Sequence, residues 1–362
     1  MSILILCAGS PGRWSGIEMH CLSLSKGLKK LGYDVYIGCH KDGYVKKQAV
    51  ALGLKTKNIR IANAVDILGL IKVAKAVYDA QIKYVVINYG RDYWPIIILS
   101  KMLNIKSIVI RHQMNRLKNK TNRLLNRYAG KVVAVSNAVR DVLLKSDIAY
   151  EKVAVIHNGI DIERFNPDRV NVNDVRAELG IKDGEILIGT ACRLKKEKGV
   201  YELLEAFNIL YKQNNANIRL MYVGDGPEMV GLKERSVELN LISKILLLGY
   251  RDDMEKLYAA MDVFVLSSTS YESFGLVIAE AMAMKTPVVA TATGGVCEII
   301  EHNRNGLLVD IKDVVSLANS IERLIKDKEL YNKFIMAGRK MVEERFTQEK
   351  MATAFVKCLV VE

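Results

Sequence analysis

The sequence predicts an α/β protein with two doubly wound parallel-sheet domains that face each other across a cleft. The chain has 362 residues, which exceeds an ordinary single-core domain and fits two domains of about 150–200 residues each. Short apolar runs alternate with longer segments of helical period, which is typical of parallel sheets covered by helices. The alternation stops at a polar stretch near residues 166–174 and then starts again.

Apolar runs of four to six residues mark the strands of the first half, and longer periodic segments mark its helices. The strands are expected at residues 3–7, 35–39, 84–87, 107–110, 131–136 and 153–156, and the helices at 19–31, 67–78 and 96–103. An Asn-Gly pair at Asn158 and Gly159 is a turn signal that closes this series.

The second half repeats the alternation and therefore forms its own parallel sheet. Its strands are expected at residues 186–190, 219–223, 245–248, 263–266 and 287–290, and a last helix at 348–359. We accordingly place an N-terminal domain at 1–165 and a C-terminal domain at 166–345. Residues 346–362 are expected to pack back on the N-terminal domain.

The net charge of +13 is concentrated in the first half. Residues 1–165 hold 27 Lys and Arg against 11 Asp and Glu, a net charge of +16, whereas the remaining residues hold 26 against 29, a net charge of −3. This asymmetry indicates that the first half contacts a polyanion, either nucleic acid or an anionic membrane surface. Interleaved exposed aromatics and known nucleic-acid modules are missing from the sequence, so nucleic acid is the disfavoured partner.

Other features of the sequence exclude several classes of protein. The first residues lack a basic leader, and the apolar runs are shorter than the roughly 20 residues of a membrane-spanning helix, so we expect a cytoplasmic protein. The six cysteines form no CxxC pair, which favours buried free thiols over disulfides or a zinc site. The first loop contains Gly9, Gly12 and Gly16 but no GxGxxG, which disfavours a nicotinamide enzyme.

The most informative segment lies at residues 267–284, directly after the strand at 263–266. Open parallel sheets bind ligands at the carboxyl ends of their strands. A helix is expected to begin near Phe274 or Gly275, and its free amides and dipole would attract phosphate. Glu280 interrupts an apolar helix, where a buried carboxylate needs hydrogen-bond donors such as a ribose diol. Glu272, in the preceding loop, would accept hydrogen bonds from sugar hydroxyls. From the residues alone, a core helix with two structural carboxylates has equal weight.

A second carboxyl-end loop follows the strand at 186–190. Arg193 and Lys198 in this loop are two cations that would neutralise a diphosphate and stabilise it as a leaving group. The alternative is a solvated basic loop, and for Lys195 and Lys196 we favour that alternative.

Taken together, these motifs resemble glycosyltransferase family 4, whose members have the two-domain GT-B fold with two Rossmann-like domains. The resemblance runs through nearly the whole chain. It is carried by residues 15–18, 133–139, 155–165, 193–199, 221–227, the Glu272 and Glu280 pair, and 293–295.

The resemblance implies a retaining glycosyltransferase that uses a nucleotide-diphosphate sugar (UDP- or GDP-linked) and no cofactor or metal. Arg193 and Lys198 would hold the diphosphate, Glu280 the ribose and Glu272 the transferred sugar, with the amides of Phe274, Gly275 and Leu276 at sugar and phosphate. Gly16 would approach the phosphate and His112 the reacting sugar as the domains close. The residues implied nearest the reaction are thus Arg193, Lys198, Glu272 and His112.

Two departures from the family pattern concern the N-terminal domain. The family usually has two glycines where this chain has Ser15 and Gly16. The sequence around His112 is not the common version either, so a structural role for this histidine has equal weight.

A basic segment follows the strand at 107–110. It is expected to form a helix between Arg116 and Tyr128, with Leu117, Leu124 and Leu125 near one face. Basic amphipathic helices lie on anionic membranes, although a solvated helix face has equal weight. The residues assigned to membrane or acceptor contact are Arg116, Lys118, Lys120, Arg123 and Arg127.

We therefore expect a hexosyltransferase of lipopolysaccharide or polysaccharide biosynthesis, peripheral on the inner face of the cytoplasmic membrane. Its acceptor would be lipid-linked or a cell-envelope saccharide. The alternatives are a sugar-nucleotide epimerase or hydrolase of the same architecture and, ranked lower, a non-enzymatic protein that binds membrane or nucleic acid.

Overall fold

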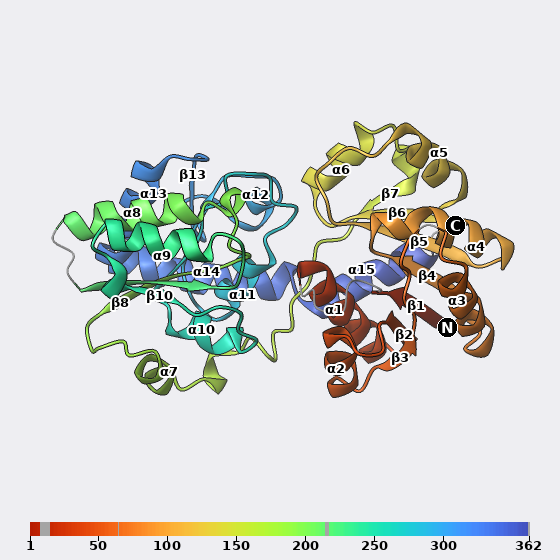
Figure 1. Cartoon of the computed structure of the whole chain (residues 1–362), viewed down its shortest axis with the longest axis horizontal. Coiled ribbons are helices and arrows are strands. Elements are labelled where there is room, and N and C mark those ends of the chain that lie inside the picture. The colour runs from red at the N-terminus through yellow and green to blue at the C-terminus, as the bar shows by residue number, and fades with distance from the viewer. Residues whose placement is uncertain (8–14, 64, 214–216, 361–362) are drawn as a thin grey trace. The chain divides into compact units, whose positions relative to one another are not determined.

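The chain folds into two units, and the computed structural model describes residues 1–7, 15–63, 65–213 and 217–360. The N-terminal unit comprises Met1–Gly159 together with Phe346–Glu362, and the C-terminal unit is Ile160–Arg345. The division falls after Gly159, whereas the sequence predicts it after residue 165. The chain passes from one unit to the other twice (Figure 1).

The N-terminal unit is built on a sheet of seven parallel strands in the order β3-β2-β1-β4-β5-β6-β7. Strand β1 lies inside the sheet between β2 and β4, and its Ile3 to Leu6 are fully buried because helices cover both faces of the sheet. The strands are β1 (Ser2–Leu6), β2 (Asp34–Cys39), β3 (Lys55–Asn58), β4 (Ile82–Ile87), β5 (Lys106–Arg111), β6 (Lys131–Ala134) and β7 (Val153–Val155).

Seven α-helices described in this unit pack around the sheet. They are α1 (Gly16–Lys30), α2 (Tyr44–Ala51), α3 (Ile67–Asp79), α4 (Tyr93–Met102), α5 (Asn119–Tyr128), α6 (Asn137–Leu144) and α15 (Gln348–Val360). Ser15 caps α1 and Ser136 caps α6, each accepting a hydrogen bond from an amide of the first turn.

Helix α15 packs against α1 although more than 300 residues separate them (Figure 1). The contact is close because Gly27 of α1 has no side chain. A Cβ at Gly27 would lie 2.7 Å from the carbonyl oxygen of Gln348 and 2.8 Å from Cβ of Ala352. Gly159 is confined in the same way, since its Cβ would lie 2.3 Å from the carbonyl oxygen of Thr347.

The C-terminal unit has a parallel sheet of six strands in the order β10-β9-β8-β11-β12-β13. The strands are β8 (Ile186–Ala191), β9 (Ile218–Val223), β10 (Ile245–Leu247), β11 (Val263–Leu266), β12 (Val288–Thr291) and β13 (Leu307–Val309). The helices are α7 (Val172–Glu178), α8 (Val200–Lys212), α9 (Met229–Glu238), α10 (Met254–Ala260), α11 (Leu276–Ala283), α12 (Val296–Ile299), α13 (Val314–Lys326) and α14 (Lys328–Arg345). The predicted α/β class with two parallel sheets is confirmed.

Each sheet reverses its strand order once, between β1 and β4 in the N-terminal unit and between β8 and β11 in the C-terminal unit. The loops after such neighbouring strands diverge and leave a ligand-binding crevice at the carboxyl edge. These two places are therefore where functional residues are expected.

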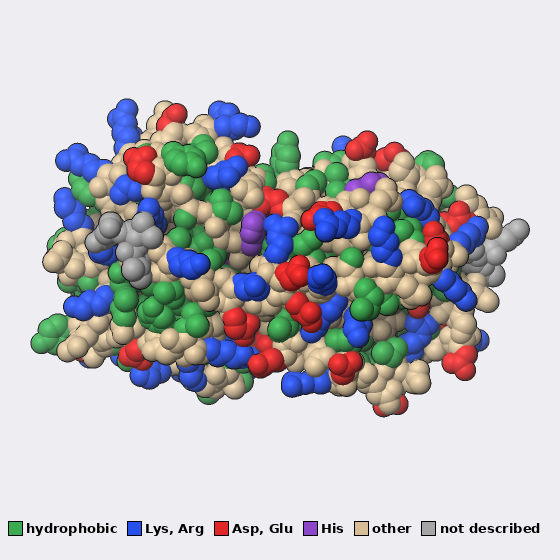
Figure 2. Space-filling model, turned by 180° about the vertical axis from the view of Figure 1, so that it is seen from behind, with side chains coloured by type: hydrophobic (Ala, Val, Ile, Leu, Met, Phe, Trp, Pro, Cys, Tyr) green, Lys and Arg blue, Asp and Glu red, His purple; other side chains and the backbone are tan. Residues whose placement is uncertain are grey.

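The surface of the N-terminal unit carries many lysine and arginine side chains (Figure 2). Among the described residues, no helix combines the length and the apolar character needed to cross a membrane.

Replacing Gly27 by Leu is expected to destabilise the N-terminal unit by about 2 kcal/mol, because the new side chain must displace α15. Gly90→Leu is the control, since a Cβ at Gly90 meets nothing within 4 Å, and it should change stability by less than about 0.5 kcal/mol. Urea denaturation measures both. Equal midpoints for the two variants would show that the contact between α1 and α15 does not matter for stability.

Candidate functional site

The loops after β8 and β11 bring four of the predicted residues to the switch point of the C-terminal sheet. Arg193 and Lys198 follow β8, while Glu272 and Gly275 follow β11. Although more than 70 residues separate the two loops in sequence, β8 and β11 are neighbouring strands. The sheet topology thus gathers these residues at one carboxyl edge.

The two loops touch through their backbones at Gly199. This glycine has a φ of +66°, and a Cβ on it would lie 1.7 Å from the carbonyl oxygen of Ser267. The Ser267 hydroxyl donates to the carbonyl of Gly199 over 2.8 Å, and the amide of Thr269 donates to the carbonyl of Glu197 over 3.0 Å. Only glycine fits here, because both the φ value and the contact exclude a side chain.

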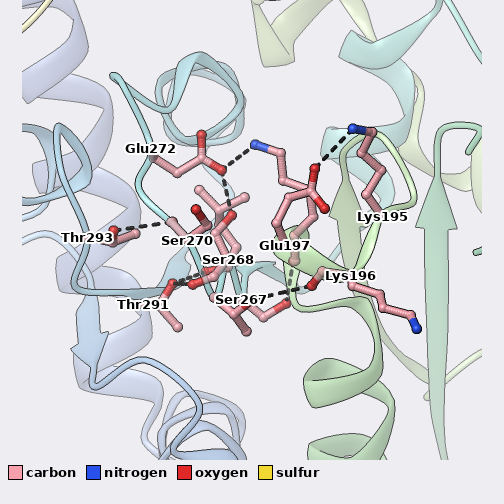
Figure 3. A network of polar contacts seen from close by, with 12 residues as sticks. Lys195, Lys196, Glu197, Ser267, Ser268, Ser270, Glu272, Thr291 and Thr293 are labelled. Carbon is pink, nitrogen blue, oxygen red and sulfur yellow. Dashed lines mark hydrogen bonds and ion pairs between the residues drawn. The ribbon is translucent and has the colours of Figure 1, made fainter. Parts of the chain in front are cut away.

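The end of β12 and the loop that follows it fix the other side of the β11 loop (Figure 3). Thr291 donates to the carbonyl of Ser268 over 2.7 Å, and Thr293 donates to that of Ser270 over 3.3 Å. A Cβ at Gly294, whose φ is +52°, would lie 2.0 Å from the carbonyl oxygen of Glu272. The segment that carries Glu272 is therefore held on both sides by backbone contacts.

Glu272 and Lys198 form an ion pair inside this frame. Lys198 Nζ lies 2.5 Å from Glu272 Oε1, and the hydroxyl of Ser268 donates to the same oxygen (Figure 3). The side chains are 13% exposed for Glu272 and 30% for Lys198. Partial burial strengthens such a charge-assisted bond, so the two side chains hold each other in position while remaining accessible to a ligand.

The other charged residues of the β8 loop lie differently. Lys195 pairs with Glu197 over 3.0 Å at the surface, and Lys196 is exposed. Arg193 is also exposed, and no hydrogen-bond or ion-pair partner for it is found in the part of the chain that the structure describes. Its guanidinium group is thus available to an anion.

Helix α11 begins at Leu276, and Gly275 is its N-cap with a φ of +95°. The sequence predicts this start near Phe274 or Gly275. The first amides of a helix have no partner within it, and the helix dipole makes this end positive. Phe274, just before this turn, is buried. Because the turn follows β11, the amides of Gly275 and Leu276 lie at the same carboxyl edge of the sheet as Lys198.

Glu280 is buried in the second turn of α11. Its Oε2 accepts a hydrogen bond of 2.9 Å from the hydroxyl of Tyr258, whereas its Oε1 is buried without a partner among the described residues. Burial raises the pKa of Glu280 to about 7, although the Tyr258 hydrogen bond and the charge of Arg164 oppose this shift. An unfilled acceptor on a buried carboxylate fits a ligand hydroxyl as donor.

The switch point of the N-terminal unit holds a second polar cluster. Gly16 is the first residue of α1, and both the Ser15 hydroxyl and the Tyr89 hydroxyl donate to the carboxylate of Glu18. Tyr89 follows β4, so this contact joins the segment after β4 to the first turn of α1. Gly9 and Gly12 of the first loop lie outside the described residues.

His112 follows β5 and belongs to this cluster. Its Nε2 lies 3.0 Å from Oδ1 of Asn88, whose amide group donates to the carbonyl of Leu6 over 3.1 Å. The ring of His20 packs edge-on against it at 4.8 Å between centroids. Burial, aided by repulsion from His20 and Arg111, holds the pKa of His112 well below its ordinary value, so the imidazole is neutral at neutral pH.

Sequence reasoning overlooked His20 and Tyr89. His20 is buried in α1, with Nδ1 2.8 Å from Oδ1 of Asn158, and burial lowers its pKa to about 4. The available signal was its place one turn after Gly16 on the same helix. No such local signal exists for Tyr89, because it meets Glu18 only through the order of the strands.

The basic segment differs from its prediction in one respect. Helix α5 starts at Asn119, not Arg116, and its Leu124 and Leu125 are buried in the unit. The apolar side of this helix therefore cannot lie on a membrane. The predicted basic residues are all exposed, and they are Arg116, Lys118, Lys120, Arg123 and Arg127.

Among the described residues, no cluster of three or more His, Cys, Asp or Glu side chains could hold a metal ion. The positive groups of the C-terminal site are instead Arg193, Lys198 and the beginning of α11.

Comparison with known proteins identifies relatives of both units. The family model described as Glycosyltransferase Family 4 matches residues 14–164, and the one described as Glycosyl transferases group 1 matches residues 171–341.

Two curated relatives illustrate the similarity. N-acetyl-alpha-D-glucosaminyl L-malate synthase of Bacillus anthracis is 31% identical over 224 residues, which are 62% of this chain and 58% of that protein. The lipopolysaccharide core biosynthesis glycosyltransferase LpsE of Rhizobium meliloti is 32% identical over 184 residues, 51% of this chain and 52% of that protein. The match thus spans little more than half the length of these relatives.

Similar solved structures include HepE of Anabaena. Its complex with UDP is 26% identical, with a TM-score of 0.85, and its complex with UDP-glucose is 25% identical, with a TM-score of 0.86. In both cases the match covers 99% of each chain.

Replacing Glu280 by Gln is expected to stabilise the C-terminal unit more at pH 8 than at pH 5, by about 2 kcal/mol. The pKa of about 7 in the folded protein lies above that in the unfolded chain. The wild-type carboxyl group therefore contributes stability at low pH that is lost as the pH rises through 7, whereas Gln has no such loss. Thermal denaturation at both pH values measures the difference.

The control for this experiment is Glu234→Gln, which changes an exposed carboxylate of the same unit. It should have little effect at either pH. An equal effect of Glu280→Gln at pH 5 and pH 8 would contradict a raised pKa.

Proposed function

Because the chain belongs to glycosyltransferase family 4, with the GT-B fold, we propose that it is a retaining glycosyltransferase. It moves a hexose-type sugar from a nucleotide-diphosphate sugar to a saccharide acceptor. The observation that carries this proposal is the ion pair of Lys198 and Glu272, held at the switch point beside Arg193 and the start of α11.

In this proposal, the donor diphosphate binds to the positive groups of the C-terminal unit. Arg193 supplies a guanidinium group that has no hydrogen-bond or ion-pair partner among the described residues. The first amides of α11 supply hydrogen-bond donors. Lys198 is paired with Glu272 and would also hold the diphosphate. As the bond to the sugar breaks, these groups stabilise the negative charge on the leaving diphosphate. A metal ion is then not needed for this purpose.

The two carboxylates take different parts of the donor. Glu272 would accept hydrogen bonds from hydroxyls of the transferred sugar, while Oε1 of Glu280 would accept one from the ribose. The second role is supported by the buried, unpartnered state of that oxygen, because a hydroxyl donor would remove the cost of leaving it unpaired.

We assign Gly16 of the N-terminal unit to the donor phosphate and His112 to the reacting sugar. The depressed pKa of His112 keeps its imidazole neutral, so it would act through hydrogen bonds and not as a cation. No activated nucleophile forms part of the described donor site. Direct displacement on the same face of the sugar, which retains the anomeric configuration, is therefore the route that we propose.

The acceptor is proposed to be a lipid-linked or cell-envelope saccharide, and the protein to act at the inner face of the cytoplasmic membrane. One relative is named for lipopolysaccharide core biosynthesis. The charge of +16 on residues 1–165 supports a location at an anionic surface. No feature of the described residues favours an epimerase or a hydrolase.

Arg193→Ala and Glu272→Ala are each expected to lower the rate of sugar transfer by about 10²–10³-fold, the usual effect of losing one group that stabilises the transition state. Lys195→Ala is the matched control, because this lysine lies in the same loop but pairs with Glu197 at the surface. Transfer and product anomer are measured by NMR. Unchanged turnover in both site variants would refute the assigned site, and inversion at the anomeric carbon would refute the retaining mechanism.

Nucleotide binding tests the donor more directly. HepE structures contain UDP, so we expect UDP to raise the melting temperature of this protein, and GDP to raise it less. A nucleotide at 100 times its Kd adds about 2.7 kcal/mol of stability. The shift should shrink in Arg193→Ala and persist in Lys195→Ala. A larger shift with GDP would assign the other base.

A further inference from the structure

Large hydrophobic side chains are exposed on the outer faces of α3 and α4 in the N-terminal unit. On α3, Leu68 is 72% exposed, Ile71 57% and Tyr78 85%, and on α4 Met102 is 77% exposed and Ile98 46%. Single exposed apolar residues are normal on proteins. Here they gather on two helices that contact each other, and such gathered patches mark interaction sites.

Helix α3 is apolar on both sides. Its inner side buries Val73, Ala76 and Val77 against the unit, while Ile67 and the exposed residues above point outwards. The inner side already satisfies the packing of the helix. Packing in the core therefore does not explain the exposed apolar residues of α3. Together with those of α4, they form what we call the α3–α4 surface, which consists of Ile67, Leu68, Ile71, Tyr78, Ile98 and Met102.

Basic residues lie within and beside this surface. Lys72 and Lys75 are exposed between the apolar residues of α3. At the contact of α4 with α5, Lys101 lies over the ring of Tyr128 at 4.4 Å. Residues 66–128 contain 12 Lys and Arg against three Asp, of which Asp92 is buried. Figure 2 shows hydrophobic side chains interspersed with lysines and arginines on this unit.

We propose that the α3–α4 surface docks onto an anionic lipid bilayer. Its apolar side chains would enter the interface while the lysines contact lipid phosphates, the combination by which interfacial helices bind membranes. A second copy of the chain fits poorly, because a two-fold contact through this surface would bring together two surfaces of the same positive charge. The exposed basic residues of α5 extend the positive field, whereas its buried leucines cannot insert.

This inference deepens the peripheral location proposed above and rests on it, but it does not require sugar transfer. It also changes which helix is responsible. The sequence pattern pointed to α5, whereas the exposed apolar residues belong to α3 and α4.

The test is sedimentation of the full chain with vesicles of phosphatidylglycerol and phosphatidylcholine in equal amounts. The wild-type protein should bind these vesicles, and should bind pure phosphatidylcholine at least tenfold less. The double variant Leu68→Asp/Ile71→Asp should lose at least tenfold in vesicle affinity. Lys72→Glu/Lys75→Glu should lose a similar amount at low salt and less at high salt, because salt screens the charges.

The matched control is Val230→Asp/Val237→Asp, which alters two exposed valines on α9 of the C-terminal unit, 67% and 54% exposed. It should bind vesicles like the wild type. Binding retained by Leu68→Asp/Ile71→Asp, or lost equally by the control, would overturn the proposal. The proposal would also be overturned if the wild-type protein were a dimer that does not bind vesicles and if Leu68→Asp/Ile71→Asp made it monomeric. The surface would then contact a second copy of the chain.

A second readout does not depend on the folding of these variants. Trp14→Phe leaves Trp94 of α4, which is 39% exposed, as the one tryptophan in the chain. Its fluorescence should be quenched by vesicles containing brominated lipid, and unquenched emission from vesicle-bound protein would overturn the assignment to this surface. The thermal shift with UDP separates the two proposals. The shift should be the same in Leu68→Asp/Ile71→Asp as in the wild type. If UDP shifted the melting temperature of neither protein, the proposed donor site would be contradicted, while the proposal for the α3–α4 surface would be unaffected.

Discussion

The candidate site depends on backbone contacts that leave no room for side chains. Gly199 and Gly294 approach the carbonyl groups of Ser267 and Glu272 so closely that a Cβ would lie within 2.0 Å of oxygen. These contacts join the loops after β8, β11 and β12 into one frame, in which Glu272 is fixed from both sides. The ion pair with Lys198 is a consequence, because it needs two loops from distant parts of the chain at a constant separation.

The C-terminal unit also buries a carboxyl group, that of Glu280, in a place where its ionised form is unfavourable. Glu280 is buried with one oxygen unpartnered, and its raised pKa reflects the cost of ionising it there. Such strain is common at functional sites, where stability and activity compete. The N-terminal unit shows the related case of His20 and His112, which burial keeps neutral. At both switch points, burial thus disfavours the ionised form of a titratable side chain.

The regular parts of the fold could be predicted from local patterns, and the rest depended on long-range packing. The strand at residues 263–266 was predicted with its observed bounds, since a buried strand has a continuous apolar run. Strand β3 was missed, because its Lys55-Thr-Lys-Asn58 sequence is polar and lies at the edge of the sheet. Helix α7 was missed within a polar stretch that resembled a linker.

The residues of the C-terminal site could be named from sequence motifs, whereas the ion pair between Lys198 and Glu272 could be found only from the structure. The outward apolar face of α3 was missed because periodicity does not tell which of two apolar faces is buried.

The contact of α15 with α1 also bears on how the protein is made. The ribosome must synthesise all 186 residues of the C-terminal unit before α15 emerges to cover Gly27 and its neighbours. At about 5–20 residues per second, this takes about 10–40 s. During that time the surface of α1 that later receives α15 is open to chaperones and to other nascent chains, while the C-terminal unit, which is continuous in sequence, is free to fold. The domain that begins first is therefore the one that finishes last.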